Sequence, residues 1–149
     1  MEVKKPFKVF RYASEVRWKT GRTGVVCSSG KPDLAVSSPL EFKGEAGNWT
    51  PEDLFVASVN VCTMLGFLAF AQHKGLNFAG YESDAEGTLE SVEGKYRITE
   101  VTLRPHITIK SHTDIELARK IIEDAHANCF IANSTTAAVK IFPQFRVQE

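Results

Sequence analysis

The chain has 149 residues, with 18 basic and 18 acidic side chains and a formal net charge of zero. Apolar residues make up 43% and charged residues 24%, a composition that excludes a disordered chain. This length is enough to bury the core of a single domain, residues 1–149. The balanced charge excludes a broad basic surface, so nucleic acid is not an expected partner. Three cysteines are too few for a secreted disulfide scaffold.

No signal-peptide pattern follows the charged N-terminal residues, so we expect a cytoplasmic location. One segment, residues 54–71, carries no formal charge and approaches the length of a membrane span. Ser58, Asn60 and Thr63 interrupt this segment, and the rest of the chain is patterned as in soluble proteins. Because a helix that is apolar on nearly all sides also suits the centre of a soluble fold or dimer, no membrane contact is expected.

The first half of the chain predicts short strands followed by a long helix. Loose alternation predicts strands over residues 9–18 and 23–28, a weaker strand over 33–37, and a loop over 38–48. Thr50 is a suitable N-cap and Pro51 a suitable first residue for a helix that ends before Gly75.

The second half predicts a hairpin, a helix and a final strand. Strand patterns cover residues 81–92 and 95–109, and Glu93 and Gly94 form the turn between them. Thr113 is the expected cap of an amphipathic helix over residues 114–127, and residues 137–147 read as the last strand. This order of elements predicts an α+β fold with antiparallel sheets and a layer of helices.

The cysteines are the first candidates for chemistry. Cys62 lies near the middle of the long helix, and Cys129 follows the second helix. Each is also explained as a small buried hydrophobic residue, and Cys27, in a strand of small residues, is assigned to packing. Because a mid-helix position gains nothing from the helix dipole, Cys62 needs a cation beside it to react as a thiolate.

Candidate cations lie upstream of the long helix. Arg22 falls at the entry to the second strand, and Arg17 lies on the first. Glu52, in the first turn of the long helix, is a candidate acid to hold such an arginine. The residues alone also allow plainer interpretations, namely a solvated turn residue for Arg22 and a helix-start charge for Glu52.

Two motifs connect these residues. TPEDLF at residues 50–55, with Cys62 ten positions after Glu52, resembles the helix motif of the OsmC/Ohr family of organic hydroperoxide reductases. AHANC at residues 125–129 and IANS at 131–134 resemble its second-cysteine motif, and residues 21–24 and 38–44 fit its N-terminal half. The resemblance implies an OsmC-like fold with two central helices, in an intertwined homodimer with two active sites at the interface.

The resemblance also implies a function, the thiol-dependent reduction of organic hydroperoxides without a cofactor. Cys62 matches the peroxidatic cysteine, Cys129 the resolving cysteine and Glu52 the acid. Arg22 matches the arginine, with Arg17 as the alternative. In such a cycle the first thiol becomes a sulfenic acid and the second condenses with it to a disulfide. The implied reductant is a small thiol or a dihydrolipoyl group.

Helix geometry constrains this set of residues. Ten residues of continuous helix place Glu52 about 15 Å from Cys62. One arginine can therefore hardly contact both residues within one chain. If the three side chains act together, Glu52 comes from the partner subunit or the helix is broken between the two positions.

Two positions depart from the family pattern and support an alternative function. Phe130 follows Cys129 where the family has proline, and Thr63 follows Cys62 where it has an aromatic residue. The alternative is a non-catalytic member of the same fold that binds a small molecule or lipid in an apolar interface pocket. The lining of such a pocket could include Met64, Phe67 and Phe70. Core packing, however, explains the apolar character of these three residues better.

Two further chemistries are less favoured. A metal site at Cys129 has His126 three residues earlier as a second ligand, but the chain has no Cys-x-x-Cys pair, and its other histidines are scattered. No metal is therefore expected. A cysteine hydrolase is weaker still, because no histidine is locally tied to Cys62.

Overall fold

The computed structural model describes residues 7–149, and its contacts define two compact units, Met1–Pro51 and Glu52–Glu149. The first unit holds a three-stranded antiparallel sheet of β1 (Glu15–Thr20), β2 (Thr23–Cys27) and β3 (Leu34–Ser37). The strand predicted over residues 9–18 begins only at Glu15, because its partner β2 ends at Cys27, directly opposite. The other two strands lie where the sequence places them.

The loop after β3 is held by its own backbone contacts. It contains one 3-10 turn, Leu40–Phe42, and Ser37 is buried at its start. The Ser37 hydroxyl accepts a hydrogen bond from the Glu45 N–H at 2.8 Å. A Cβ added at Gly44 would clash with the backbone carbonyl of Ser38, so this turn requires glycine.

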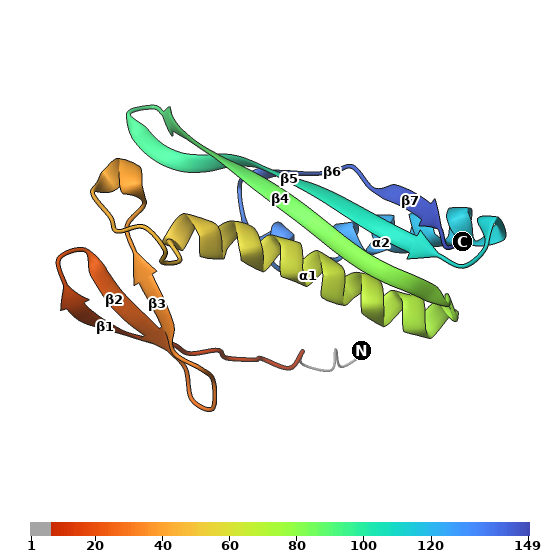
Figure 1. Cartoon of the computed structure of the whole chain (residues 1–149), viewed down its shortest axis with the longest axis horizontal. Coiled ribbons are helices and arrows are strands. Elements are labelled where there is room, and N and C mark those ends of the chain that lie inside the picture. Colours follow the sequence, from red (N-terminus) through yellow and green to blue (C-terminus); the bar gives the residue numbers. More distant parts are fainter. Residues whose placement is uncertain (1–6) are drawn as a thin grey trace, which may run out of the picture. The chain divides into compact units, whose positions relative to one another are not determined.

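The second unit is a four-stranded sheet with two helices (Figure 1). Its elements in chain order are α1 (Pro51–Lys74), β4 (Phe78–Val92), β5 (Lys95–Ile109), α2 (Ile115–Ala127), β6 (Ala138–Ile141) and β7 (Gln144–Val147). The long β4–β5 hairpin is antiparallel, and its turn places Glu93 and Gly94 at positive φ, 53° and 82°. The α+β fold, the hairpin and both helices are as predicted from the sequence.

The last strand differs from its prediction. Residues 137–147 form two short strands, both of which pair with β5 in parallel, so the sheet is mixed. Phe142 and Pro143 separate the two strands. Proline has no N–H to continue the ladder, while the Phe142 N–H bonds to the Leu103 carbonyl at 2.9 Å.

The start of α2 also differs in detail. A 3-10 turn, His112–Asp114, precedes the helix, and the predicted cap Thr113 lies inside this turn. The Ser111 side chain takes the capping role, because its oxygen accepts the Thr113 N–H at 3.3 Å.

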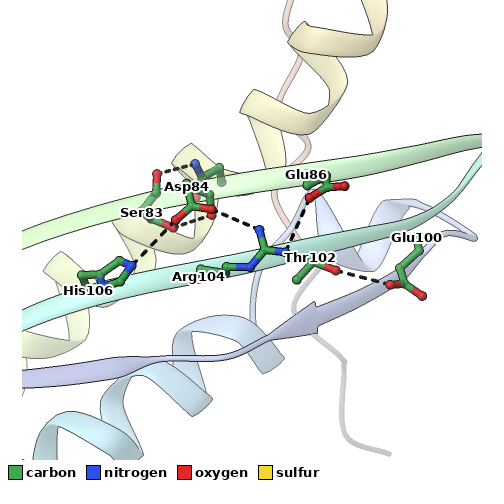
Figure 2. Close-up of polar contacts among 8 residues, drawn as sticks. Ser83, Asp84, Glu86, Glu100, Thr102, Arg104 and His106 are labelled. Carbon is green, nitrogen blue, oxygen red and sulfur yellow. Dashed lines mark hydrogen bonds and ion pairs between the residues drawn. The ribbon is translucent and has the colours of Figure 1, made fainter.

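The outer face of the sheet carries polar side chains from both strands of the hairpin. Figure 2 shows Asp84 and Glu86 of β4 on either side of Arg104 of β5. The Arg104 guanidinium lies 3.1 Å from the Asp84 carboxylate and 3.5 Å from that of Glu86. His106 lies 3.7 Å from the Asp84 carboxylate. These pairs are exposed, so each contributes at most about 1 kcal/mol of stability.

The inner face of the sheet carries the core. Every second residue of β5 from Val101 to Ile109 is buried, and α1 and α2 both pack against these side chains. α2 contributes its predicted apolar face, Ala118, Ile121, Ile122 and Ala125. α1 contributes a stripe with four-residue spacing, Val59, Thr63, Phe67 and Ala71.

The opposite side of α1 is exposed in the part of the chain that the structure describes. Val61 and Leu65 are 48% and 55% exposed, and Leu68 is 37% exposed. By length and hydropathy α1 meets the criterion for a membrane span, which central helices of soluble folds also meet. Only 22% of the most apolar 18-residue stretch of α1 is buried. The exposed apolar face of α1 is therefore a candidate interaction surface.

Candidate active site

The structure brings Cys62 and Cys129 together. Cys62 projects from the middle of α1, and Cys129 lies in the turn that follows α2. The two thiols are close enough to interact directly, and both remain free. The two cysteines are 67 positions apart in the sequence. The packing of α1 against α2 brings their side chains close together.

The Cys129 sulfur has a defined set of neighbours. The residue is 2% exposed, and its sulfur accepts a hydrogen bond from the Ala132 N–H at 3.4 Å. Burial raises the pKa of the Cys129 thiol above its ordinary value, and the adjacent Cys62 thiol acts in the same direction. The Ala132 N–H and the Thr63 hydroxyl lower this pKa. The surroundings of Cys129 thus contain groups that oppose the thiolate and groups that favour it.

An apolar cavity of about 680 Å³ lies beside the two cysteines. One wall comes from α1 and the other from the end of α2 and the turn after it. Besides the cysteines, its apolar lining includes Val61, Leu65, Phe70, Phe130 and Ile131. A cavity of this size and lining suits an apolar organic molecule that reaches the two sulfurs.

The aromatic residues and Met64, considered as pocket candidates, divide between two roles. Phe70 lines the cavity, whereas Phe67 is fully buried in the core, where its ring packs on those of Phe78 and Tyr81. Met64 lies at a separate small pocket on the β4 side. Sequence reasoning missed the contribution of Ile131 to the cavity, and no periodic signal marks this residue.

Glu52 lies in the first turn of α1 and is half-buried. Its Oε2 atom is inaccessible to solvent and has no hydrogen-bond partner among residues 7–149. α1 runs without a break from Pro51 to Lys74, so helix geometry keeps Glu52 about 15 Å from Cys62. The alternative of a broken helix is thereby excluded.

The candidate arginines lie in the first unit. Arg22 follows Gly21 in the turn between β1 and β2, is exposed, and forms no ion pair with a described residue. Arg17 on β1 has two carboxylates nearby, with Glu15 at 3.9 Å and Asp33 at 3.7 Å. Of the two arginines, Arg22 is therefore the one whose guanidinium has no ion-pair partner among the described residues.

Cys27 and His126, the histidine of the disfavoured metal site, lie apart from the pair of thiols in function. The Cys27 thiol faces the Glu15 carbonyl at 3.7 Å within the first sheet. In the part of the chain that the structure describes, no group of three or more His, Cys, Asp or Glu side chains could hold a metal ion. Burial lowers the pKa of His126, whose Nδ1 atom is buried and bonds to none of the residues from 7 to 149.

Comparisons with known proteins agree on the family. Residues 44–142 match the family model described as OsmC-like protein. A comparison with curated proteins found no match.

Solved structures show the same fold over most of the chain. An OsmC-like protein of unknown function from Vibrio cholerae is 27% identical, with a TM-score of 0.84 over 91% of this chain and 100% of that chain. An organic hydroperoxide resistance protein OsmC from Legionella pneumophila is 25% identical, with a TM-score of 0.70 over 91% and 98%. An organic hydroperoxide resistance protein from Elizabethkingia anophelis is 23% identical, with a TM-score of 0.72 over 93% and 99%.

Proposed function

Because the chain belongs to the OsmC-like protein family, we propose that it is a thiol-dependent peroxidase that reduces organic hydroperoxides to alcohols. The names of the Legionella and Elizabethkingia structures support a redox protein that acts on peroxides. The observation that carries the proposal is the pair of interacting thiols, Cys62 and Cys129, at the wall of an apolar cavity.

Cys62 performs the first step. Its thiolate attacks the distal oxygen of the hydroperoxide, the O–O bond breaks, and the alkoxide takes up a proton to leave as an alcohol. The Cys62 sulfur is thereby oxidised to a sulfenic acid. The cavity walls remove water from the alkyl group of the substrate, which favours bulky organic hydroperoxides over hydrogen peroxide.

Cys129 performs the second step. Its thiolate attacks the Cys62 sulfur, hydroxide leaves and is protonated to water, and a Cys62–Cys129 disulfide remains. A small-thiol or dihydrolipoyl reductant then exchanges with this disulfide and returns both thiols, while its own two sulfurs become a disulfide. The contact between the two residues in the reduced chain favours this cycle.

Arg22 and Glu52 act together in the proposal, and the working unit is a homodimer. A guanidinium beside Cys62 favours the thiolate and steadies the developing alkoxide. The Glu52 oxygen and the Arg22 guanidinium, neither of which has a partner among residues 7–149, are complementary, and a carboxylate holds a guanidinium in a fixed orientation. Because the continuous helix separates Glu52 from Cys62, we propose that the partner subunit's Glu52 supplies this contact. The exposed apolar face of α1 supports such a dimer.

Stopped-flow mixing with cumene hydroperoxide tests the activity. We expect wild type to consume peroxide rapidly and to form an intramolecular Cys62–Cys129 disulfide, and Cys62→Ser to lose both reactions. Cys129→Ser should oxidise once and then stop, with Cys62 as the sulfenic acid. Equally slow consumption by wild type and Cys62→Ser would contradict the proposal. Retention of all thiols with a ligand bound in the cavity would favour a non-catalytic binder.

A further inference from the structure

One hydroxyl group interrupts the buried stripe of α1. Val59, Thr63, Phe67 and Ala71 follow one another at four-residue spacing toward the sheet, and Thr63 is their only polar member. Thr63 is completely buried. A hydroxyl in this position therefore has to find its partners inside the protein.

The Thr63 hydroxyl has none of the usual partners. A helical threonine often bonds back to the carbonyl four residues earlier, but the Thr63 Oγ1 atom makes no hydrogen bond to any described residue. The buried cluster around Val59, one helical turn before Thr63, packs against Ala132, whose N–H donates to the Cys129 sulfur. The Cys129 thiol is thus the polar neighbour of Thr63, and the hydroxyl favours its ionised form. A neutral thiol is a weak acceptor, so this contact satisfies the hydroxyl poorly in the reduced protein.

The contact changes when Cys129 ionises. A thiolate is a strong acceptor, and hydrogen bonds to a charged atom are roughly twice as strong as those between neutral groups. The Ala132 N–H already donates to the same sulfur at 3.4 Å, and a thiolate sulfur accepts more than one hydrogen bond. The hydroxyl is thus in place to stabilise the one form of Cys129 that burial opposes.

On this basis, and resting on the proposed function, we propose that the Thr63 hydroxyl donates a hydrogen bond to the Cys129 thiolate and so speeds disulfide formation. In that step the Cys129 sulfur forms the S–S bond and is oxidised, the S–O bond of the Cys62 sulfenic acid breaks, and the Cys129 proton leaves with hydroxide as water. Thr63 neither gains nor loses a proton overall. Its contribution is confined to the second step of the cycle.

Two substitutions separate this role from packing. Thr63→Val keeps the shape and removes the hydroxyl, and Thr63→Ser keeps the hydroxyl and removes a methyl group. Because the hydroxyl is buried without a satisfied partner, we expect Thr63→Val to unfold at the same or a higher denaturant concentration than wild type. A loss of function in Thr63→Val would then not reflect a loss of fold.

The first measurement needs no peroxide. With Cys27 and Cys62 both replaced by serine, the rate of alkylation by iodoacetamide against pH reports the pKa of Cys129 alone. We expect Thr63→Val to raise this pKa by about 0.5–1 unit and Thr63→Ser to restore it. An identical titration curve for the valine and threonine proteins would overturn the proposal.

The second measurement follows disulfide formation after one equivalent of cumene hydroperoxide. A rise of one pKa unit lowers the thiolate fraction about tenfold, and the greater nucleophilicity of the more basic thiolate recovers part of this, for a net slowing of about threefold. Disulfide formation in Thr63→Val should therefore slow more than the first step does, and most at neutral pH. Equal slowing of both steps would also contradict the proposal. If wild type leaves the peroxide unreacted, the proposed function fails, while the titration still decides whether Thr63 acts on Cys129.

Discussion

Gly66 of α1 meets Ala125 of α2 so closely that a Cβ added at residue 66 would lie 3.3 Å from the Ala125 Cβ. Ala125 is 1% exposed, so it has little room to move. Cys62 lies one helical turn before Gly66, and Cys129 lies four residues after Ala125. The contact between these two small residues therefore sets how near the two thiols come.

The first prediction concerns this contact. Gly66→Val should push α2 away from α1, because the added side chain meets both the Cβ and the backbone of Ala125. We expect a loss of about 1–3 kcal/mol in the free energy of unfolding, measured by urea denaturation. We also expect slower formation of the Cys62–Cys129 disulfide, because the sulfurs are farther apart.

A matched control places valine elsewhere on the same helix. His73 is exposed near the end of α1, so His73→Val changes helix propensity with little packing change and should cost at most about 0.5 kcal/mol. If Gly66→Val and His73→Val unfold alike and form the disulfide alike, the contact with Ala125 has no influence on the site.

Much of the fold could be predicted because its signals are local. Pro51 and Gly75 bound α1, and the Glu93–Gly94 pair marks the hairpin turn, since each residue suits one backbone conformation. The parallel pairing of β6 and β7 with β5 could not be predicted, because strand direction depends on the route of the chain after α2.

The site was predictable only in part. The motif around Cys62 and Cys129 identified two residues that the structure brings together. The Thr63 hydroxyl and the Ala132 N–H at the Cys129 sulfur had no sequence signal, because both contacts arise from three-dimensional packing after α2. The pairing of Arg22 with Glu52 remains a prediction.

The second prediction concerns the number of free thiols that remain after oxidation. One equivalent of hydroperoxide should remove two of the three free thiols, and peptide mapping after alkylation should find the label on Cys27. Cys27 belongs to the first sheet, where its thiol faces the Glu15 carbonyl. Cys27→Ser should therefore consume peroxide as fast as wild type. After oxidation this variant should have no free thiol left, because its two remaining cysteines form the disulfide. A Cys27-containing disulfide in wild type would contradict the pairing.

The third prediction concerns the exposed face of α1. Leu65→Arg places a charge where 55% of the side chain is exposed in a single chain. We expect light scattering to show wild type at twice the 16.5-kDa chain mass and Leu65→Arg largely at the chain mass, because burying the charge in an interface is costly. Because Leu65 also lines the cavity beside the cysteines, the mass of Leu65→Arg rather than its activity decides this prediction.

Lys110→Glu is the control for that substitution. Lys110 is exposed just after β5, away from α1 in the sequence, and its change also alters the charge of the chain. This variant should keep the mass and activity of wild type. A monomeric wild type with full activity would exclude a catalytic role for the partner.

The fourth prediction is a loss of stability at alkaline pH through Tyr81. Burial raises the pKa of Tyr81 from 10.0 to about 12. The folded protein thus holds the phenolic proton more tightly than the unfolded chain does. The stabilising contribution is complete below pH 10 and is lost as the pH rises through the folded value. Tyr81→Phe removes this pH-dependent contribution to stability and keeps the ring contact with Phe67.

Urea denaturation at pH 10 and pH 11 measures the effect. Wild type should lose about 1 kcal/mol more than Tyr81→Phe over this interval. Tyr12 is 92% exposed, so Tyr12→Phe should follow the wild-type pH dependence. Cys129, whose pKa is also raised, destabilises the fold in the same direction, but it is present in all three proteins and cancels in the comparison. Parallel curves for wild type and Tyr81→Phe would show that Tyr81 ionises as readily in the folded protein as in the unfolded chain.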